Sequence, residues 1–169
     1  FVDRVNMSGL TLRNSCPSCY GLYVSSSSDC IFSENVLTGN GRGIYLIDCS
    51  RTTIEDNLVT NNRVGVSLVM STNCVLRDNI LQGNLYSLDV SGGASLRQYV
   101  HDVDVSNIAD GKPIYYWVNE RNKQVPLDAA YVAVINSTNV VVRDLNLSKN
   151  YQGVLFAFTD SSIIENVTV

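Results

Sequence analysis

The chain has 169 residues, of which 45% are hydrophobic and 17% are charged, so it can bury the core of one globular domain. Its net charge of −4 at pH 7 offers no basic face, and we therefore expect no nucleic-acid partner. No uninterrupted apolar run approaches about 18 residues, so the sequence predicts no membrane span in this segment.

A repeat of 22 residues dominates the first half of the chain. Within each repeat, apolar residues alternate over short runs, which is the period of a strand. A unit of this length holds about three short strands with turns between them, so each unit predicts one coil of a parallel β-helix. The spacing is carried by Gly21-Leu22-Tyr23-Val24, Gly43-Ile44-Tyr45-Leu46 and Gly65-Val66-Ser67-Leu68, and by the asparagines Asn35, Asn57, Asn79 and Asn40, Asn62, Asn84.

Equivalent residues of successive coils are expected about 4.8 Å apart, in columns that run along the stack. Ile44 should then lie inside the cylinder between Leu22 and Val66. We interpret the repeated asparagines as structural ladders at corners, because Asn tolerates a left-handed backbone and its amides can hydrogen-bond along the stack. The repeated glycines are interpreted as turn residues.

Apolar pairs five residues apart extend the register to seven coils. The predicted fold is an all-β solenoid, a single-stranded parallel β-helix that forms one domain over residues 1–169. Insertions in a solenoid become surface loops, so the longest one is predicted to be a surface excursion at about 109–130. The chain begins and stops within coils, whose open ends would expose unpaired backbone, and we expect it to be a fragment of a longer protein.

The five cysteines fall into two groups. Cys30, Cys49 and Cys74 lie within coils and are expected to be buried thiols. Cys30 and Cys74 are two coils apart, a distance of about 9.6 Å, which is too long for a disulfide. Cys16 and Cys19 form a CxxC in a loop, which fits a disulfide, half of a metal site or two unpaired thiols. Cysteine usage therefore leaves the redox compartment open.

One column of acidic residues, Glu34, Asp56 and Asp78, is the nearest arrangement to a metal site. Such a column could hold Ca²⁺. We favour a solvated or corner-hydrogen-bonded row instead, and we assign no catalytic residue, metal or cofactor. His101 has no partner identifiable from spacing, so we interpret it as an isolated surface histidine rather than a general acid.

The candidate ligand-binding site is in the long insertion, which holds the densest aromatic cluster and the only Trp. Aromatic faces beside polar groups suit sugar rings, which present an apolar C–H face and hydroxyl edges. The alternative is that these aromatics anchor the insertion against the cylinder. The candidate residues are Tyr115, Tyr116, Trp117, Lys112 and Arg121.

The repeat Gly43-Ile44-Tyr45-Leu46, the stretch Thr53–Asn57 and the following Thr60-Asn61-Asn62 resemble the right-handed parallel β-helix repeats of NosD-like proteins. These belong to a wider group of carbohydrate-binding and sugar-hydrolase β-helix domains. The stretch from Asp110 to Asn119 resembles the insertion found in NosD-like repeats of archaeal surface and secreted proteins. The resemblance implies a right-handed coil, an extracytoplasmic, secreted or cell-surface location and an archaeal origin, but no reaction.

These observations favour a structural or glycan-binding module without catalysis, whose partner is a polysaccharide or a cell-surface glycan. The alternative is a fragment of a polysaccharide-active enzyme, a lyase, hydrolase or epimerase, although the paired carboxylates or cation-holding acids of such enzymes are not recognisable. A second alternative, copper maturation, follows only from the NosD-like resemblance. His101, Met7 and Met70 are far apart in the repeat, whereas copper needs grouped nitrogen or sulfur ligands.

Overall fold

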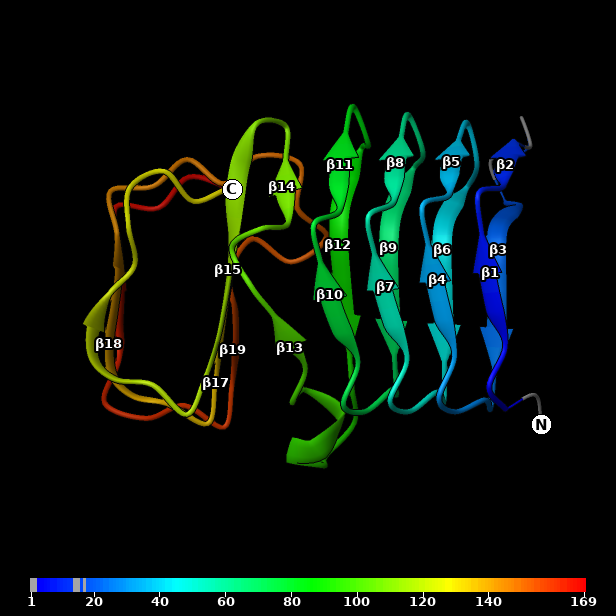
Figure 1. Cartoon of the computed structure of the whole chain (residues 1–169). Coiled ribbons are helices and arrows are strands. Elements are labelled where there is room, and N and C mark those ends of the chain that lie inside the picture. Colours follow the sequence, from blue (N-terminus) through cyan, green and yellow to red (C-terminus); the bar gives the residue numbers. More distant parts are fainter. Residues whose placement is uncertain (1–2, 14–15, 17) are drawn as a thin grey trace.

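The computed structural model describes residues 3–13, 16 and 18–169, and it is an all-β solenoid of about seven turns. The sheets form two stacks of coils, which Figure 1 shows side-on at the right and nearly end-on at the left. Among the described residues the only helix is the short 3₁₀ helix η1 (Leu96–Gln98), and no helix is long or apolar enough to cross a membrane.

The first stack has three walls of parallel strands, as its 22-residue repeat predicts. One wall consists of β1 (Asn6–Ser8), β4 (Ile31–Ser33), β7 (Thr53–Glu55), β10 (Val75–Arg77) and β13 (Asp102–Val103). The second consists of β2 (Thr11–Arg13), β5 (Val36–Thr38), β8 (Leu58–Thr60), β11 (Ile80–Gln82) and β14 (Ile108–Ala109). The third consists of β3 (Tyr20–Ser25), β6 (Arg42–Ile47), β9 (Val64–Val69) and β12 (Tyr86–Ser91).

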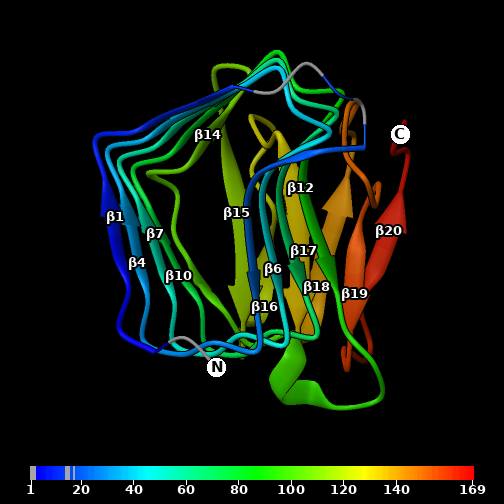
Figure 2. The same cartoon turned by 90° about the vertical axis from the view of Figure 1, so that its right-hand side faces the viewer.

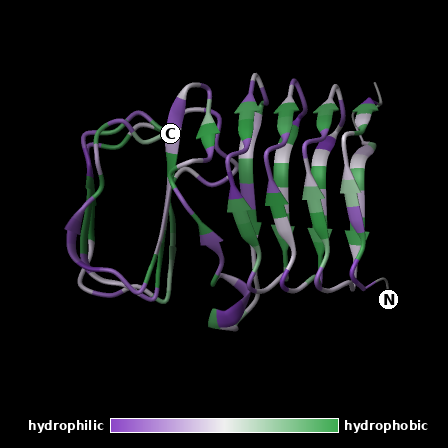
Figure 3. Cartoon of the chain, viewed as in Figure 1, coloured by the Kyte–Doolittle hydropathy of each residue, from purple (hydrophilic) through white to green (hydrophobic). Residues whose placement is uncertain are grey.

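The predicted aliphatic columns are confirmed in this stack. Ile44 pairs with Leu22 on one side and with Val66 on the other, and its side chain is fully buried. In Figure 2 the coils superimpose along the axis of the stack, and Figure 3 shows hydrophobic stretches repeated from strand to strand.

Two asparagine ladders run through the interior of the first stack, as predicted. Asn57 Nδ2 donates to Asn79 Oδ1 at 3.0 Å, and Asn57 Oδ1 accepts from Asn35 Nδ2 at 3.1 Å. The ladder continues to Asn107, whose Oδ1 accepts from Asn79 Nδ2 at 2.8 Å. Each amide also satisfies backbone groups of the neighbouring coil, and Asn57 Nδ2 donates to the carbonyl of Phe32 at 2.8 Å. The ladders therefore supply the hydrogen bonds that buried backbone groups at the corners would otherwise make with water.

The left-handed backbone expected at the ladder asparagines belongs to the residues before them. Glu34, Asp56 and Asp78 have φ of 57°, 55° and 51°, and their side chains are exposed. The corner residue therefore points into solvent, and the next residue turns its amide inward.

The repeated glycines of the first stack are not turn residues, which corrects the prediction. Gly21, Gly43 and Gly65 lie within strands β3, β6 and β9, where the coils approach closely. A Cβ on Gly43 would lie 2.6 Å from the carbonyl oxygen of Gly65 and 2.6 Å from Val59 Cγ1. Glycine is required here because any side chain would collide with the next coil.

The second stack begins inside the segment predicted to be a surface excursion. After β14 the chain turns at Asp110 and Gly111, both with positive φ, into the antiparallel strand β15 (Lys112–Val118). This strand is followed by β16 (Arg121–Gln124), β17 (Tyr131–Ile135), β18 (Thr138–Arg143), β19 (Leu155–Ala157) and β20 (Ile163–Glu165). Strands β15, β17 and β19 form one parallel wall, and β16, β18 and β20 form another. Residues 109–130 are therefore a coil of the solenoid and not a loop beside it.

Strand β17 is buried on both faces and joins the two stacks. Tyr131, Ala133 and Ile135 belong to the core of the first stack, whereas Val132 and Val134 belong to the core of the second. Figures 1 and 2 show β15, β17 and β19 across one end of the first stack, with the second stack running crosswise to it. This wall covers a coil end that would otherwise expose its core.

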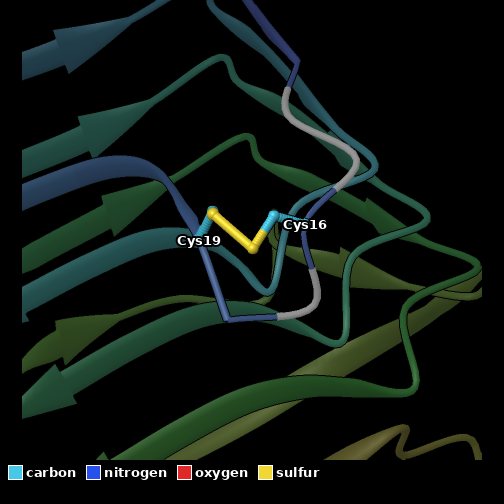
Figure 4. The surroundings of a disulfide bond; sticks show 2 residues. All are labelled: Cys16 and Cys19. Carbon is cyan, nitrogen blue, oxygen red and sulfur yellow. A yellow bond between two sulfur atoms is a disulfide. The ribbon is translucent and has the colours of Figure 1, made fainter.

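The cysteines separate as their positions in the repeat suggest. Cys30, Cys49 and Cys74 are buried within the first stack, and the structure shows no disulfide at any of them. Cys16 and Cys19 form a disulfide in the connection between β2 and β3, with Cα atoms 5.1 Å apart (Figure 4). Of the three forms that the CxxC left open, the structure has the disulfide.

Candidate functional site

The aromatic cluster of the long insertion lies on β15, and the alternation of this strand divides it. Tyr116 faces the first core and is only 6% exposed, and its hydroxyl donates to the carbonyl of Tyr99. Burial raises the pKa of Tyr116 well above its ordinary value. Tyr115 and Trp117 face the opposite way and pack against the second core. The three rings therefore do not form one surface.

Polar contacts hold the two rings on the second face. The Tyr115 hydroxyl donates to Asp128 Oδ1 at 3.0 Å, and its ring meets the Trp117 ring edge-on, with centroids 6.1 Å apart. Lys123 Nζ lies 5.4 Å from the centroid of the Trp117 ring, within the range of a cation–π interaction. The anchoring role that the sequence left open is thus visible for all three aromatics.

A groove of about 480 Å³ lies where the two stacks meet, between β10 and β13 on one side and β15 on the other. It brings together only two of the five candidate residues, Tyr116 and Trp117. Lys112 and Arg121 are exposed but do not line it, and Tyr115 does not line it either. Among the other residues that line the groove are Asn73, His101, Asp102 and Glu120.

His101 is buried at this junction, which corrects its interpretation as a surface residue. It is 4% exposed, and its Nδ1 accepts a hydrogen bond from the backbone N–H of Cys74 at 3.3 Å. Its ring lies 6.0 Å from that of Tyr116. Burial lowers the pKa of His101 to about 4, so the imidazole is neutral at physiological pH. The sequence did not reveal this position, because an insertion places His101 27 residues after Cys74, whereas the repeat is 22 residues long.

The carboxylates of the groove are held in ion pairs. Asp102 pairs with Arg77, whose Nε also lies 3.1 Å from Asp104 Oδ2. Glu120 Oε2 lies 2.6 Å from Lys123 Nζ. Each of these two carboxylates of the groove therefore lies beside a cation of this chain.

The acidic column lies on the outside of the first stack. Glu34, Asp56 and Asp78 project from corners into solvent. Across the described ranges, no three His, Cys, Asp or Glu side chains are grouped so that they could hold a metal ion. Of the two forms left open by the sequence, the structure has the solvated row.

Comparison with known families matches residues 2–107 to the model described as "NosD: Periplasmic copper-binding protein (NosD)". The chain belongs to the NosD family. No curated protein and no solved structure matched the chain. The matched region ends at Asn107, the last member of the longer asparagine ladder, so the family pattern coincides with the first stack.

The donor groups of this chain do not fit the copper that the family description names. Copper sites group imidazole, thiolate or thioether ligands around one point. The only histidine is neutral but buried, and Met7 and Met70 belong to the first and third coils. Burial raises the pKa of Cys49 and raises that of Cys74 to about 12, which opposes formation of thiolates.

Proposed function

We propose that this NosD-family chain is a non-catalytic, glycan-binding β-helix module of an extracytoplasmic protein. The extracytoplasmic placement follows from the family description, which names a periplasmic protein. The observation that carries the proposal is the groove at the junction of the stacks. There Trp117 and Tyr116 line the same space as Asn73 and Asp102, so that aromatic and polar residues meet in one groove.

This combination suits a sugar better than an apolar ligand. A sugar ring places its C–H face against an aromatic side chain, and its hydroxyls bond to amides and carboxylates around the edge. The volume of about 480 Å³ lies within the range of small-ligand sites. Both walls stand on strands, which hold the groove in shape before a ligand arrives.

The same residues argue against catalysis in the groove. A general acid works best with a pKa near the working pH. His101 has a pKa of about 4 and its Nδ1 is occupied by the backbone of Cys74. Asp102 and Glu120 are paired with Arg77 and Lys123. Both carboxylates are thus engaged by cations of this chain, and the imidazole, whose Nε2 has no hydrogen-bond partner among the described residues, stays neutral.

The test is a titration of the protein with a panel of soluble neutral polysaccharides, with and without Ca²⁺, while Trp117 fluorescence is recorded. Trp117 is the only indole, so its emission reports on the groove directly. We expect one glycan to give a saturable shift. Calorimetry with Trp117→Ala should then show an affinity at least about tenfold lower, equivalent to about 1.4 kcal/mol.

Tyr151→Ala is the matched control, since this tyrosine is 49% exposed and does not line the groove. It should bind the glycan as the unaltered protein does. Equal loss in both variants would contradict a site at Trp117. A panel without any binder would favour a purely structural module, and release of new reducing or unsaturated ends from a glycan would favour the polysaccharide-active enzyme.

A further inference from the structure

A second aromatic surface lies on the outer face of β3 and β6, in the first two coils and away from the groove. It is formed by Tyr20, Tyr23 and Tyr45, whose ring centroids are 5.1 to 5.6 Å apart in every pair. Tyr20 and Tyr45 are nearly parallel, at 14°. We call these three residues the tyrosine platform. Tyr23 is 53% exposed and Tyr20 is 39% exposed, so the rings are open to solvent.

The repeat does not require these rings. In the next coil the residues in register with Arg42 and Tyr45 are Val64 and Ser67. Strand β9 nevertheless keeps the same pairing and the same buried core as β6. The tyrosines are therefore an addition to the outside of the coil and not a part of its folding pattern. Cross-strand aromatic pairs add modest stability, but they do not explain why the most exposed ring faces water.

Arg42 adds an unpaired positive charge to the platform. Its guanidinium carbon lies 4.9 Å from the centroid of the Tyr45 ring. None of the ion pairs found in the described part of the chain includes Arg42, and its buried Nε has no hydrogen-bond partner there. The carboxylate in the same column as Tyr45 is Asp89, two coils away, where it accepts hydrogen bonds from Ser91 and Gln152. Within the described ranges, Arg42 thus lies beside the exposed rings without a carboxylate partner.

We propose that the tyrosine platform and Arg42 bind an acidic polysaccharide built from uronic acid residues. A uronic acid has an apolar C–H face, which stacks on the ring of Tyr23 or Tyr20, and a carboxylate, which pairs with the guanidinium of Arg42. A neutral sugar would use the rings but leave the cation unpaired. The charge complementarity of Arg42 selects the acidic class, and the site is independent of the groove.

The experiment measures binding to polygalacturonate by affinity electrophoresis and calorimetry, with fully methyl-esterified polygalacturonate as the neutral probe. We expect the unesterified polymer to bind at least about tenfold more tightly, because its carboxylates are free. Tyr23→Ala and Arg42→Gln should each lower affinity for polygalacturonate at least about tenfold. Arg42→Gln should also remove the preference over the ester. Added salt should weaken the binding.

Two control variants separate this site from the groove and from folding. Trp117→Ala and Tyr151→Ala should bind polygalacturonate as the unaltered protein does. Circular dichroism and thermal melting should show that Tyr23→Ala is folded, since its ring is mostly exposed. Absence of binding to polygalacturonate, equal binding of both polymers, or loss only with Trp117→Ala would each overturn the proposal. Concentration-dependent dimers that Tyr23→Ala abolishes, without polymer binding, would show that a second copy occupies the platform instead.

Discussion

The two stacks of this protein differ in the side chains that hydrogen-bond to buried backbone at their corners. Both must satisfy buried backbone at corners and hold each coil in register with the next. The first stack does so with interior asparagines such as Asn57, which bridge three coils through one amide. The second has no buried asparagine among its described residues, and it relies on a buried hydroxyl of the kind that Ser71 also supplies after β9 in the first stack. Ser137 is 2% exposed, accepts from the backbone N–H of Glu120 at 3.0 Å and donates to the carbonyl of Ile135.

The asparagines of the second stack lie on its surface. Asn136 Nδ2 donates to Asn119 Oδ1 at 2.6 Å, and Asn139 Nδ2 donates to Asn122 Oδ1 at 2.8 Å, between exposed side chains. All four residues have positive φ, so they occupy the corner position that Glu34 has in the first stack. The comparison teaches that an asparagine repeated in register can be an interior ladder or an exterior corner residue. The spacing alone does not distinguish them.

The largest expected change in stability comes from removing one amide of the interior ladder, that of Asn57. Asn57→Ala removes an amide that serves Asn35, Asn79 and Phe32, and it leaves their buried polar groups unsatisfied. We expect the free energy of unfolding to fall by about 4 kcal/mol. Urea unfolding followed by circular dichroism measures the change. The surface counterpart Asn139→Gly, which keeps a residue suited to positive φ, should change it by about 0.5 kcal/mol or less.

The same variant tests whether the stacks unfold together. Because β17 contributes to both cores, a defect in the first stack should lower the stability of the second. Trp117 packs against the second core, so its fluorescence should report the same shifted midpoint as circular dichroism. A Trp117 transition that stays in place while the dichroism transition moves would show two independent units.

The periodic part of the fold could be predicted from sequence because each residue there has the same neighbours in every coil. The column of Leu22, Ile44 and Val66 and the ladder of Asn35 and Asn57 follow from spacing alone. The corner and glycine roles were assigned to the wrong residues. A period places a residue in a column, but it does not say whether the side chain turns inward or how closely the backbones approach.

The sequence placed coils after the insertion but not their separate stack, because the first step there is 17 residues, as from Trp117 to Val134, and not 22. Two signals were present. Asp110-Gly111, between Ala109 and Lys112, is typical of a two-residue hairpin turn. Asn119 and Asn136 repeat the 17-residue spacing. The groove could not be predicted at all, because it arises where stacks with different axes meet and no local pattern records that crossing.

A second prediction concerns the junction between the stacks, where His101 is buried. The folded chain holds this imidazole at a pKa of about 4 because burial disfavours the charged form, whereas the ordinary value is 6.5. Below pH 6.5 the unfolded chain therefore binds a proton that the folded chain does not. The free energy of unfolding should fall by about 3 kcal/mol as the pH drops from about 6.5 to about 4, and this contribution should then stop changing.

The measurement is urea unfolding at several pH values between 7 and 4, on the unaltered protein and on His101→Asn. The amide of Asn keeps an acceptor near the backbone of Cys74 but does not titrate in this range. The carboxyl groups whose pKa the fold lowers, such as that of Asp110, lose their contribution only below about pH 4. Equal pH dependence of the two proteins would show that His101 is solvated and that the junction is open.

The smallest expected change in stability concerns the glycine column, and it compares a glycine inside the first stack with the residue that takes its place in the last complete coil. The glycine column runs Gly21, Gly43, Gly65, and Ser87 follows in β12, an edge strand of its wall. No further strand of that wall follows β12, and Ser87 instead donates its backbone N–H to the carbonyl of Lys149 at 3.0 Å, where its side chain is accommodated. Gly43→Ala should lower the free energy of unfolding by about 2 kcal/mol, because its methyl group would meet a carbonyl oxygen at 2.6 Å. Ser87→Gly should lower it by less than about 1 kcal/mol, since it adds only backbone freedom to the unfolded chain.

Thermal and urea unfolding of both variants measure these changes. A Gly43→Ala protein as stable as the original would mean that the coils can separate at this wall, and the glycines would then have to be explained by something other than close approach.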